Sequence, residues 1–171
     1  LFTIGYEFPS TISKNQYMVK KIDRKNDFNN SQALTHLACL TKAASSKVHT
    51  LILEDGVTMK REWGRMLEVL KETDEYTQKR WDVIIFTQKV KEWKLLKDCG
   101  NGLKIFQTFN NESVQGYLVN GLYINRLFLH LTQRIRQSIR RGQSFDLQMF
   151  YQELQKTDQW IAYNIPMAIG D

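Results

Sequence analysis

The sequence of 171 residues lacks long hydrophobic runs, and it has only two cysteines. No stretch approaches the roughly 20 apolar residues of a transmembrane helix, so we expect no membrane span and leave peripheral association open. Cys39 and Cys99 form no metal-binding or redox motif, which favours a reducing, cytoplasmic compartment over a secreted protein. The chain begins at Leu1 without a methionine, as a fragment or a processed product does, so the absence of a secretory signal excludes nothing.

The signature motifs of several enzyme classes are also absent. The chain contains neither G-x-x-x-x-G-K-[ST] nor G-x-G-x-x-G, which argues against a P-loop kinase and a nicotinamide dehydrogenase. The absence of G-x-S-x-G argues against a serine hydrolase. The three histidines, His36, His49 and His130, lie far apart and belong to no H-E-x-x-H or Cys/His motif, so a zinc site is not expected.

The charge of the chain points to anionic partners. The formal net charge is +6 and the isoelectric point is about 9.3, which suits nucleotides, phosphorylated substrates, nucleic acid or an anionic membrane surface. One basic cluster stands out, made of Arg134, Arg136, Arg140 and Arg141. Such a cluster is more often a solvated helix end than a phosphate site, and no aromatic residues interleave with it as in a single-strand binder. We therefore do not expect a nucleic-acid partner.

Length and composition predict one folded α/β domain over residues 1–171. Hydrophobic residues make up 42% and aromatic residues 12% of the chain, which is enough for a core. Apolar runs and helical periodicity alternate along the chain, which predicts a mostly parallel sheet joined by right-handed crossovers. The expected strands are 1–6, 48–54, 81–86, 103–109 and 160–165. The expected helices are 31–45, about 59–71, 117–140 and 146–156. We expect Ser31 to be the N-cap of the first helix, Leu67 to lie on the apolar face of the second, and Gly142 to end the third. Residues 22–30 are expected to form a loop, and residues 87–102 a functional loop or a short helix.

The central feature is a strand that ends in two carboxylates. Residues 48–53 are mostly apolar, and Glu54, Asp55 and Gly56 follow directly. Ligands of α/β sheets bind outside the carboxyl ends of strands, and one or two carboxylates together with substrate phosphates can hold Mg²⁺ or Mn²⁺. The other interpretation is a strand that ends in a solvated acidic turn.

Two further residues also have two interpretations each. His36 lies on the helix before this strand, where a buried, hydrogen-bonded structural histidine is the commoner role and a place in a ligand pocket is the other. Asp146 precedes a helix, so the spacing favours an N-cap. Its other role is a carboxylate that takes a proton from an attacking hydroxyl.

Taken together, several segments resemble glycosyltransferase family 25, the family of bacterial lipopolysaccharide galactosyltransferases and collagen galactosyltransferases. The resemblance runs in order from about residue 31 to the end of the chain. Residues 31–36 (SQALTH) are similar to the family's G-C-A-L-S-H, 51–57 (LILEDGV) to L-I-L-E-D-D-V, 81–86 (WDVIIF) to W-D-x-I-x-L, and 115–120 (QGYLVN) to the aromatic-Tyr opening of a long helix. Phe145-Asp146 is similar to a later apolar-Asp pair, and Ile165-Pro166 to a Pro-containing segment after the last strand.

The resemblance implies a GT-A-like (Rossmann-like) three-layer α/β/α sandwich and a sugar transferase. The donor would be a nucleotide-sugar, with a UDP-sugar expected, and the sugar would pass with inversion to a hydroxyl of a glycan or protein. By the same resemblance, Asp55 and Glu54 would bind Mn²⁺ or Mg²⁺, and Asp146 would be the catalytic base. His36, Gln115 and Tyr117 would line or support the donor pocket.

The chain also departs from the family. Gly56 stands where the family has a third acid, Ser31 replaces a glycine, and Thr35 replaces a serine. Residues 21–24 (KIDR) match the family's first strand poorly, so we expect that strand to have diverged or to be missing from this chain. The alternative is therefore a catalytically inactive domain of this type that binds a glycan or a protein.

Overall fold

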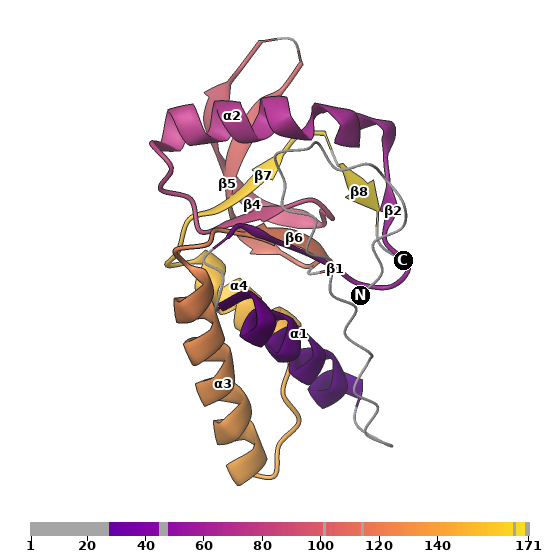
Figure 1. The fold of residues 1–171 in the computed structure, drawn as a ribbon, viewed down its shortest axis with the longest axis vertical. Coiled ribbons are helices and arrows are strands. Elements are labelled where there is room, and N and C mark those ends of the chain that lie inside the picture. Colours follow the sequence, from indigo (N-terminus) through magenta and orange to yellow (C-terminus); the bar gives the residue numbers. More distant parts are fainter. Residues whose placement is uncertain (1–27, 45–47, 101, 114, 166, 170–171) are drawn as a thin grey trace.

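The computed structural model describes residues 28–44, 48–100, 102–113, 115–165 and 167–169 (Figure 1). The strand predicted at 1–6, the segment at 21–24 and most of the loop predicted at 22–30 fall outside these residues, and residues 28–30 of that loop belong to a helix instead. The elements are α1 (Phe28–Ala44), β1 (Thr50–Leu53), β2 (Thr58–Met59), a 3₁₀ helix (Arg61–Arg65), α2 (Met66–Thr77), β3 (Val83–Ile85), β4 (Val90–Asp98), β5 (Lys104–Asn111), β6 (Gly116–Val119), α3 (Ile124–Arg140), α4 (Leu147–Gln155), β7 (Trp160–Tyr163) and β8 (Ala168–Ile169).

The six-stranded sheet has the order β1-β6-β3-β7-β5-β4, and a separate two-stranded sheet joins β2 to β8. Only β3 and β7 pair in parallel among the described strands of the larger sheet. The α/β prediction is confirmed, but the prediction of a mostly parallel sheet is wrong. Strand β6 lies between β1 and β3 and runs antiparallel to both, so β1 and β3 point the same way but are separated in the sheet by β6. In the described part of the chain β1 is also the terminal strand, and not a central one.

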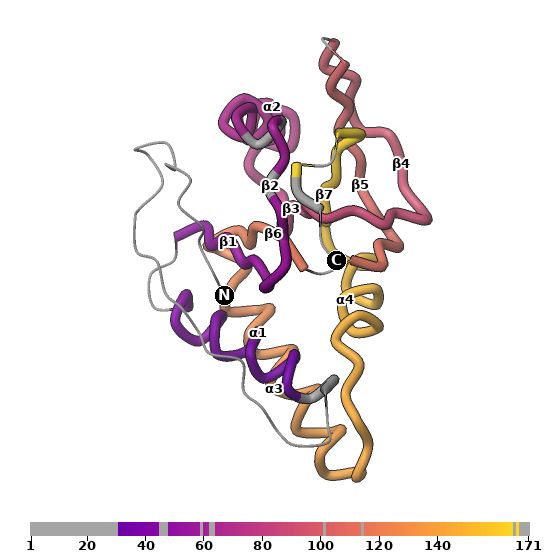
Figure 2. The backbone as a smooth tube through the Cα atoms, turned by 90° about the vertical axis from the view of Figure 1, so that its right-hand side faces the viewer, coloured from indigo at the N-terminus to yellow at the C-terminus, as the bar shows by residue number. Residues whose placement is uncertain are grey.

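Helices cover both faces of this sheet (Figure 1, Figure 2). Helix α2 lies on one face, and α1, α3 and α4 lie on the other. Side chains of β3 alternate between the two cores: Val83 and Ile85 pack with α1, α3 and α4, and Ile84 packs with α2. Because both faces are covered, the strand reads as a continuous apolar run. The described residues include no helix that is long and apolar enough to cross a membrane.

Several predicted elements are confirmed with shifted ends. Helix α1 begins at Phe28, so Ser31 is not its N-cap and instead lies inside the helix with 1% of its surface exposed. Gly142 follows α3 with a φ of 64°, which confirms the predicted stop. In α2, Leu67 is 43% exposed, so its predicted inward position is wrong. The strands predicted at 48–54, 81–86, 103–109 and 160–165 appear as β1, β3, β5 and β7, and the helix predicted at 146–156 appears as α4.

Within 87–102, where we predicted a functional loop or a short helix, Val90–Asp98 form strand β4. Strand β4 is mostly exposed, and among the described strands it pairs with β5 alone, at the end of the sheet. Its sequence therefore shows no buried face, and its partner supplies the backbone hydrogen bonds that make it a strand. Trp93 on β4 lies against Phe106 on β5, with ring centroids 4.6 Å apart.

The helix predicted over 117–140 is two elements. Residues 116–119 form β6, buried on both faces, and α3 begins only at Ile124. Asn120, itself buried, makes the break: its side chain donates to the Trp81 carbonyl at 2.8 Å and accepts from the Leu122 amide at 3.0 Å. By its pattern, a four-residue apolar run fits a buried strand and a helix equally well. Here the segment forms a strand because it lies between β1 and β3 and pairs with both.

Candidate functional site

The site lies where the carboxyl ends of β1 and β3 meet the start of β6. The Glu54 amide donates to the Gln115 carbonyl at 2.7 Å, and the Phe86 and Thr87 amides donate to the Gly116 carbonyl at 2.9 and 3.2 Å. An antiparallel strand between two parallel ones places its first residues beside their last residues. The topology therefore brings the acidic strand end, Thr87 and the start of β6 to one edge of the sheet.

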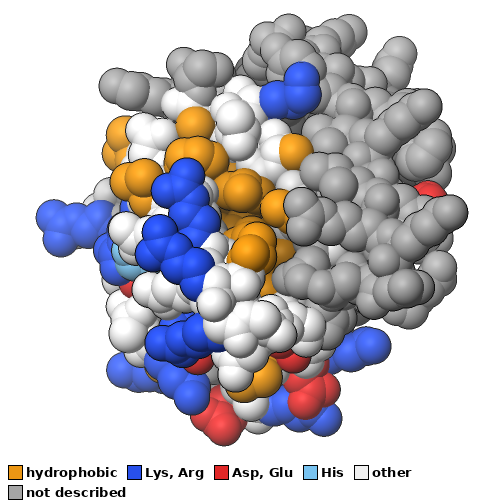
Figure 3. Space-filling model, turned by 90° about the horizontal axis from the view of Figure 1, so that it is seen from below, with side chains coloured by type: hydrophobic (Ala, Val, Ile, Leu, Met, Phe, Trp, Pro, Cys, Tyr) orange, Lys and Arg blue, Asp and Glu red, His pale blue; other side chains and the backbone are white. Residues whose placement is uncertain are grey.

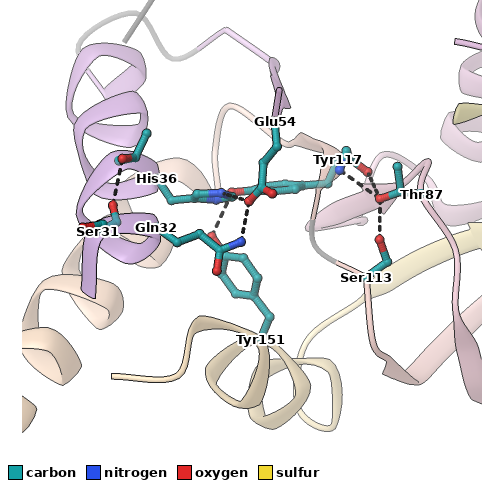
Figure 4. A network of polar contacts seen from close by, with 10 residues as sticks. Ser31, Gln32, His36, Glu54, Thr87, Ser113, Tyr117 and Tyr151 are labelled. Atoms are coloured by element: carbon teal, nitrogen blue, oxygen red, sulfur yellow. Dashed lines mark hydrogen bonds and ion pairs between the residues drawn. The ribbon is translucent and has the colours of Figure 1, made fainter. Parts of the chain in front are cut away.

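Helix α1 holds the carboxylate of Glu54. Its Oε1 atom accepts from Gln32 Nε2 at 2.7 Å and contacts His36 Nε2 at 2.6 Å (Figure 4). Gln32 and His36 are four residues apart, so both side chains lie on the same face of the helix. The Glu54 side chain is 21% exposed and that of His36 only 2%. The carboxylate thus faces solvent on one side and two fixed donors on the other.

A chain of hydrogen bonds continues from His36 into the core. His36 Nδ1 lies 2.6 Å from the Tyr117 hydroxyl, which lies 2.8 Å from the Tyr151 hydroxyl of α4. The His36 and Tyr117 rings stack at 5.7 Å and 19°. When Nε2 of a neutral imidazole donates to Glu54, Nδ1 accepts from Tyr117, and Tyr117 in turn accepts from Tyr151. Each buried polar group in the chain then has a partner, as a low-dielectric interior requires.

Burial fixes the protonation of both tyrosines. Desolvation raises the pKa of the Tyr117 hydroxyl well above its ordinary value and also raises the pKa of the Tyr151 hydroxyl. Both hydroxyls therefore remain protonated at neutral pH, and each can donate one hydrogen bond while accepting another. The hydrogen-bonded chain Tyr151–Tyr117–His36 therefore positions the Glu54 carboxylate, together with Gln32.

A second polar cluster joins β3 to the start of β6. Thr87 Oγ1 accepts from the Gly116 amide at 2.9 Å and from Ser113 Oγ at 2.8 Å (Figure 4). Thr87 and Ser113 are both buried. Gly116 packs so closely here that a Cβ atom would lie 3.0 Å from Thr87 Cγ2 and 3.4 Å from Leu53 Cδ2. The site edge is therefore tightly packed.

We expect Gly116→Ala to destabilise the protein by about 1–3 kcal/mol, since an added methyl group in a packed core forces neighbouring atoms apart. Chemical denaturation measures the change. Gly64→Ala is the matched control, because a Cβ atom at Gly64 meets nothing within 4 Å. Adding Thr87→Ser to Gly116→Ala removes the clashing Cγ2 atom and should recover part of the loss. Equal stability of Gly116→Ala and the parent protein would contradict this packing argument.

Asp55 differs from Glu54 in its surroundings. It is exposed, and its Oδ1 accepts from the Gly56 amide at 3.1 Å. Gly56 has a φ of 87°, in the left-handed region that glycine adopts without strain. Among the described residues no three His, Cys, Asp or Glu side chains cluster as a metal site. The predicted Mn²⁺ or Mg²⁺ would therefore rest on Asp55 and substrate phosphates, a ligand set that Mg²⁺ uses elsewhere, while Glu54 stays bound to α1.

Asp146 is the N-cap of α4. Its Oδ1 accepts from the Met149 amide at 3.0 Å, which confirms the structural interpretation. Tyr151, whose hydroxyl bonds to that of Tyr117, lies five residues after Asp146. Five residues correspond to about 7.5 Å along a helix. Asp146 also lines a pocket of about 220 Å³ between α3 and α4, together with Arg134, Arg141 and Ser144. Its role as a base stays a prediction.

The structure brings four of the predicted site residues together, namely His36, Glu54, Gln115 and Tyr117. Gln115 takes part through its backbone carbonyl. Sequence reasoning missed Gln32, Thr87, Ser113 and Tyr151. Gln32 had a signal, because it precedes His36 by one helical turn on the same face. Tyr151 had only its place on the apolar face of α4, which does not distinguish a polar contact from ordinary packing.

Comparison of the chain with models of known protein families and with curated protein sequences finds no match.

Proposed function

We propose that the protein is a glycosyltransferase that moves a sugar from a nucleotide-diphosphate donor, such as a UDP-sugar, to a hydroxyl of a glycan or protein, with inversion. The observation that carries the proposal is that the four segments resembling glycosyltransferase family 25 are neighbours in the fold. They form α1, the ends of β1 and β3, and β6. Side chains from three of them, Gln32 and His36, Glu54, and Tyr117, bond to one another.

Asp55 and Glu54 have surroundings that agree with the proposed roles, whereas the role of Asp146 rests on the resemblance alone. Asp55, exposed beyond β1, is the carboxylate available to hold a divalent ion, which neutralises charge on the departing diphosphate. Glu54 lies beside it in an orientation that Gln32 and His36 fix. An acceptor hydroxyl forms the new bond to the anomeric carbon while the bond to the diphosphate oxygen breaks. Asp146 is the carboxylate assigned to take the hydroxyl proton.

Titration of the protein with UDP-sugars, with and without Mn²⁺, tests the proposal. We expect binding that Mn²⁺ strengthens, and an Asp55→Asn variant that loses about tenfold or more of this Mn²⁺-dependent affinity. Asp98→Asn is the matched control, because Asp98 is also exposed and also accepts a backbone amide, that of Gly100 at 3.1 Å. No binding by the folded parent protein under either condition would reject the sugar-transfer proposal.

The second candidate is an inactive domain of this type that binds a glycan or a protein. It is favoured by Gly56, which stands where the family has a third acid and has a φ of 87°, in the left-handed region that favours glycine. We expect Gly56→Asp to lose about 1 kcal/mol of stability, similar to Gly142→Asp, where φ is 64°. Transfer assays on parent and variant separate the candidates. Turnover by the parent supports the enzyme, and turnover gained only by Gly56→Asp indicates a decayed enzyme.

A further inference from the structure

The outer side of α3 carries exposed leucine and arginine residues that sugar transfer does not use. The inner side buries Ile124, Leu127, Leu131 and Ile135. On the opposite side, Leu129 is 54% exposed, and Leu122, just before the helix, is 86% exposed. Leu129 and Arg136 are seven residues apart, and Gln133 and Arg140 are also seven apart, so each pair follows one line along the helix. We call Leu122, Leu129, Gln133, Arg136 and Arg140 the α3 outer surface.

The charged side chains of α3 are all positive. Its sequence contains no aspartate or glutamate, and with the next residue it contains five arginines. Arg126 pairs with Asp158 at 2.8 Å and Arg134 with Glu153 at 2.6 Å. Arg136, Arg140 and Arg141 are exposed and make no ion pair with the described residues. The end of α3 is therefore a local excess of positive charge that the described part of the protein does not neutralise.

Exposed hydrophobic and basic side chains lie together at this end of the molecule. Ile139, between two of the arginines, is 50% exposed. Figure 3 views the molecule from the end at which α3 terminates, and it shows Lys and Arg side chains in a band beside hydrophobic side chains. The main apolar face of α3 is buried in the core, but its exposed leucines and arginines still offer both contacts that a lipid–water interface rewards, apolar burial and attraction to anionic lipid.

We propose that the α3 outer surface docks the protein on an anionic phospholipid membrane. The leucines would enter the boundary between headgroups and acyl chains, while the long arginine stems reach the phosphates above it. A protein groove that receives a helix needs apolar anchors at i, i+3, i+4 and i+7, and here the outward positions between Leu122 and Leu129 are polar or basic. A nucleic acid would leave the aliphatic side chains without a role.

Co-sedimentation of the 171-residue chain with phosphatidylcholine vesicles, with and without phosphatidylglycerol, tests the proposal. We expect binding that requires phosphatidylglycerol and weakens with salt. Arg136→Gln with Arg140→Gln should weaken it about tenfold, and Leu122→Ser with Leu129→Ser by a similar factor. Arg80→Gln with Lys94→Gln is the control, because it removes the same charge from exposed positions on other elements and should bind like the parent protein.

Any one of the following results would overturn the proposal. The first is the same affinity for vesicles with and without phosphatidylglycerol. The second is an equal loss of binding in the control variant, which would indicate a general charge effect. The third is unchanged vesicle binding by both α3 variants, or binding to a DNA or RNA oligonucleotide that the arginine variant abolishes while vesicles are not bound. All the substituted residues are exposed, and the buried Trp81 and Trp160 report by fluorescence that each variant is folded.

Discussion

Replacing His36 by alanine is expected to lower the free energy of unfolding by about 3 kcal/mol and to weaken donor binding. The ring is buried and both its nitrogens are bonded, to Glu54 and to Tyr117. Its removal leaves a cavity and takes one partner from each of two other polar groups. Glu54 would keep Gln32 as a partner but would lose the support that fixes its orientation.

Urea denaturation and titration with a UDP-sugar measure the two effects. His130→Ala is the matched control, because His130 is only partly buried on α3, and we expect it to cost less than 1 kcal/mol. A double-mutant cycle of His36→Ala with Tyr117→Phe should show that the two losses are not additive, since both break the same hydrogen-bonded chain. Additive losses would show that His36 and Tyr117 are not energetically coupled. A His36→Ala variant as stable as the parent protein would show that the hydrogen bonds of His36 do not stabilise the fold.

The Asp158→Ala substitution is also expected to cost about 3 kcal/mol of stability. The Asp158 side chain is 2% exposed and accepts from Arg126 at 2.8 Å and from the Tyr123 hydroxyl. These contacts tie the turn before β7 to α3. Removing the carboxylate leaves the buried Tyr123 hydroxyl without its acceptor, and an unsatisfied buried polar group is costly.

The exposed pair between Arg134 and Glu153 provides the comparison. Its side chains are 44% and 54% exposed, so Glu153→Ala should cost less than 1 kcal/mol. Asp158→Asn keeps an acceptor oxygen and should fall between the two. The three free energies of unfolding, measured under the same conditions, test the ranking. Equal costs for Asp158→Ala and Glu153→Ala would mean that burial does not decide the strength of these pairs.

Local patterns were enough to predict most of the elements on the α1 side of the sheet. In the helix predicted at 146–156, Leu147, Phe150, Tyr151 and Leu154 recur at helical spacing, and all four are buried in α4. Its apolar face has a helical period, which a strand cannot reproduce. Strand β4 was missed for the opposite reason. It is exposed along most of its length, so no alternation of apolar and polar residues reveals it.

Local sequence patterns did not predict which strands pair with one another. The pattern predicts a helix from Tyr117 onward, but residues 117–119 belong to β6, and this error also led to the wrong prediction of a mostly parallel sheet. Inserting β6 between β1 and β3 turns two expected parallel neighbours into two antiparallel pairs. The backbone groups that pair strands are the same in every residue except proline. An apolar run therefore does not predict which strand will pair with it.

For the site, the sequence by itself determined that an apolar strand ends in Glu54 and Asp55, followed by a glycine that permits the turn. It also placed Gln32 and His36 on one face of a helix. Only the tertiary structure decided that this face meets Glu54, and that the bonded chain continues to Tyr117, 81 residues from His36, and on to Tyr151. A helical period fixes which side chains share a face, but the partner of that face is chosen by the packing of the whole core.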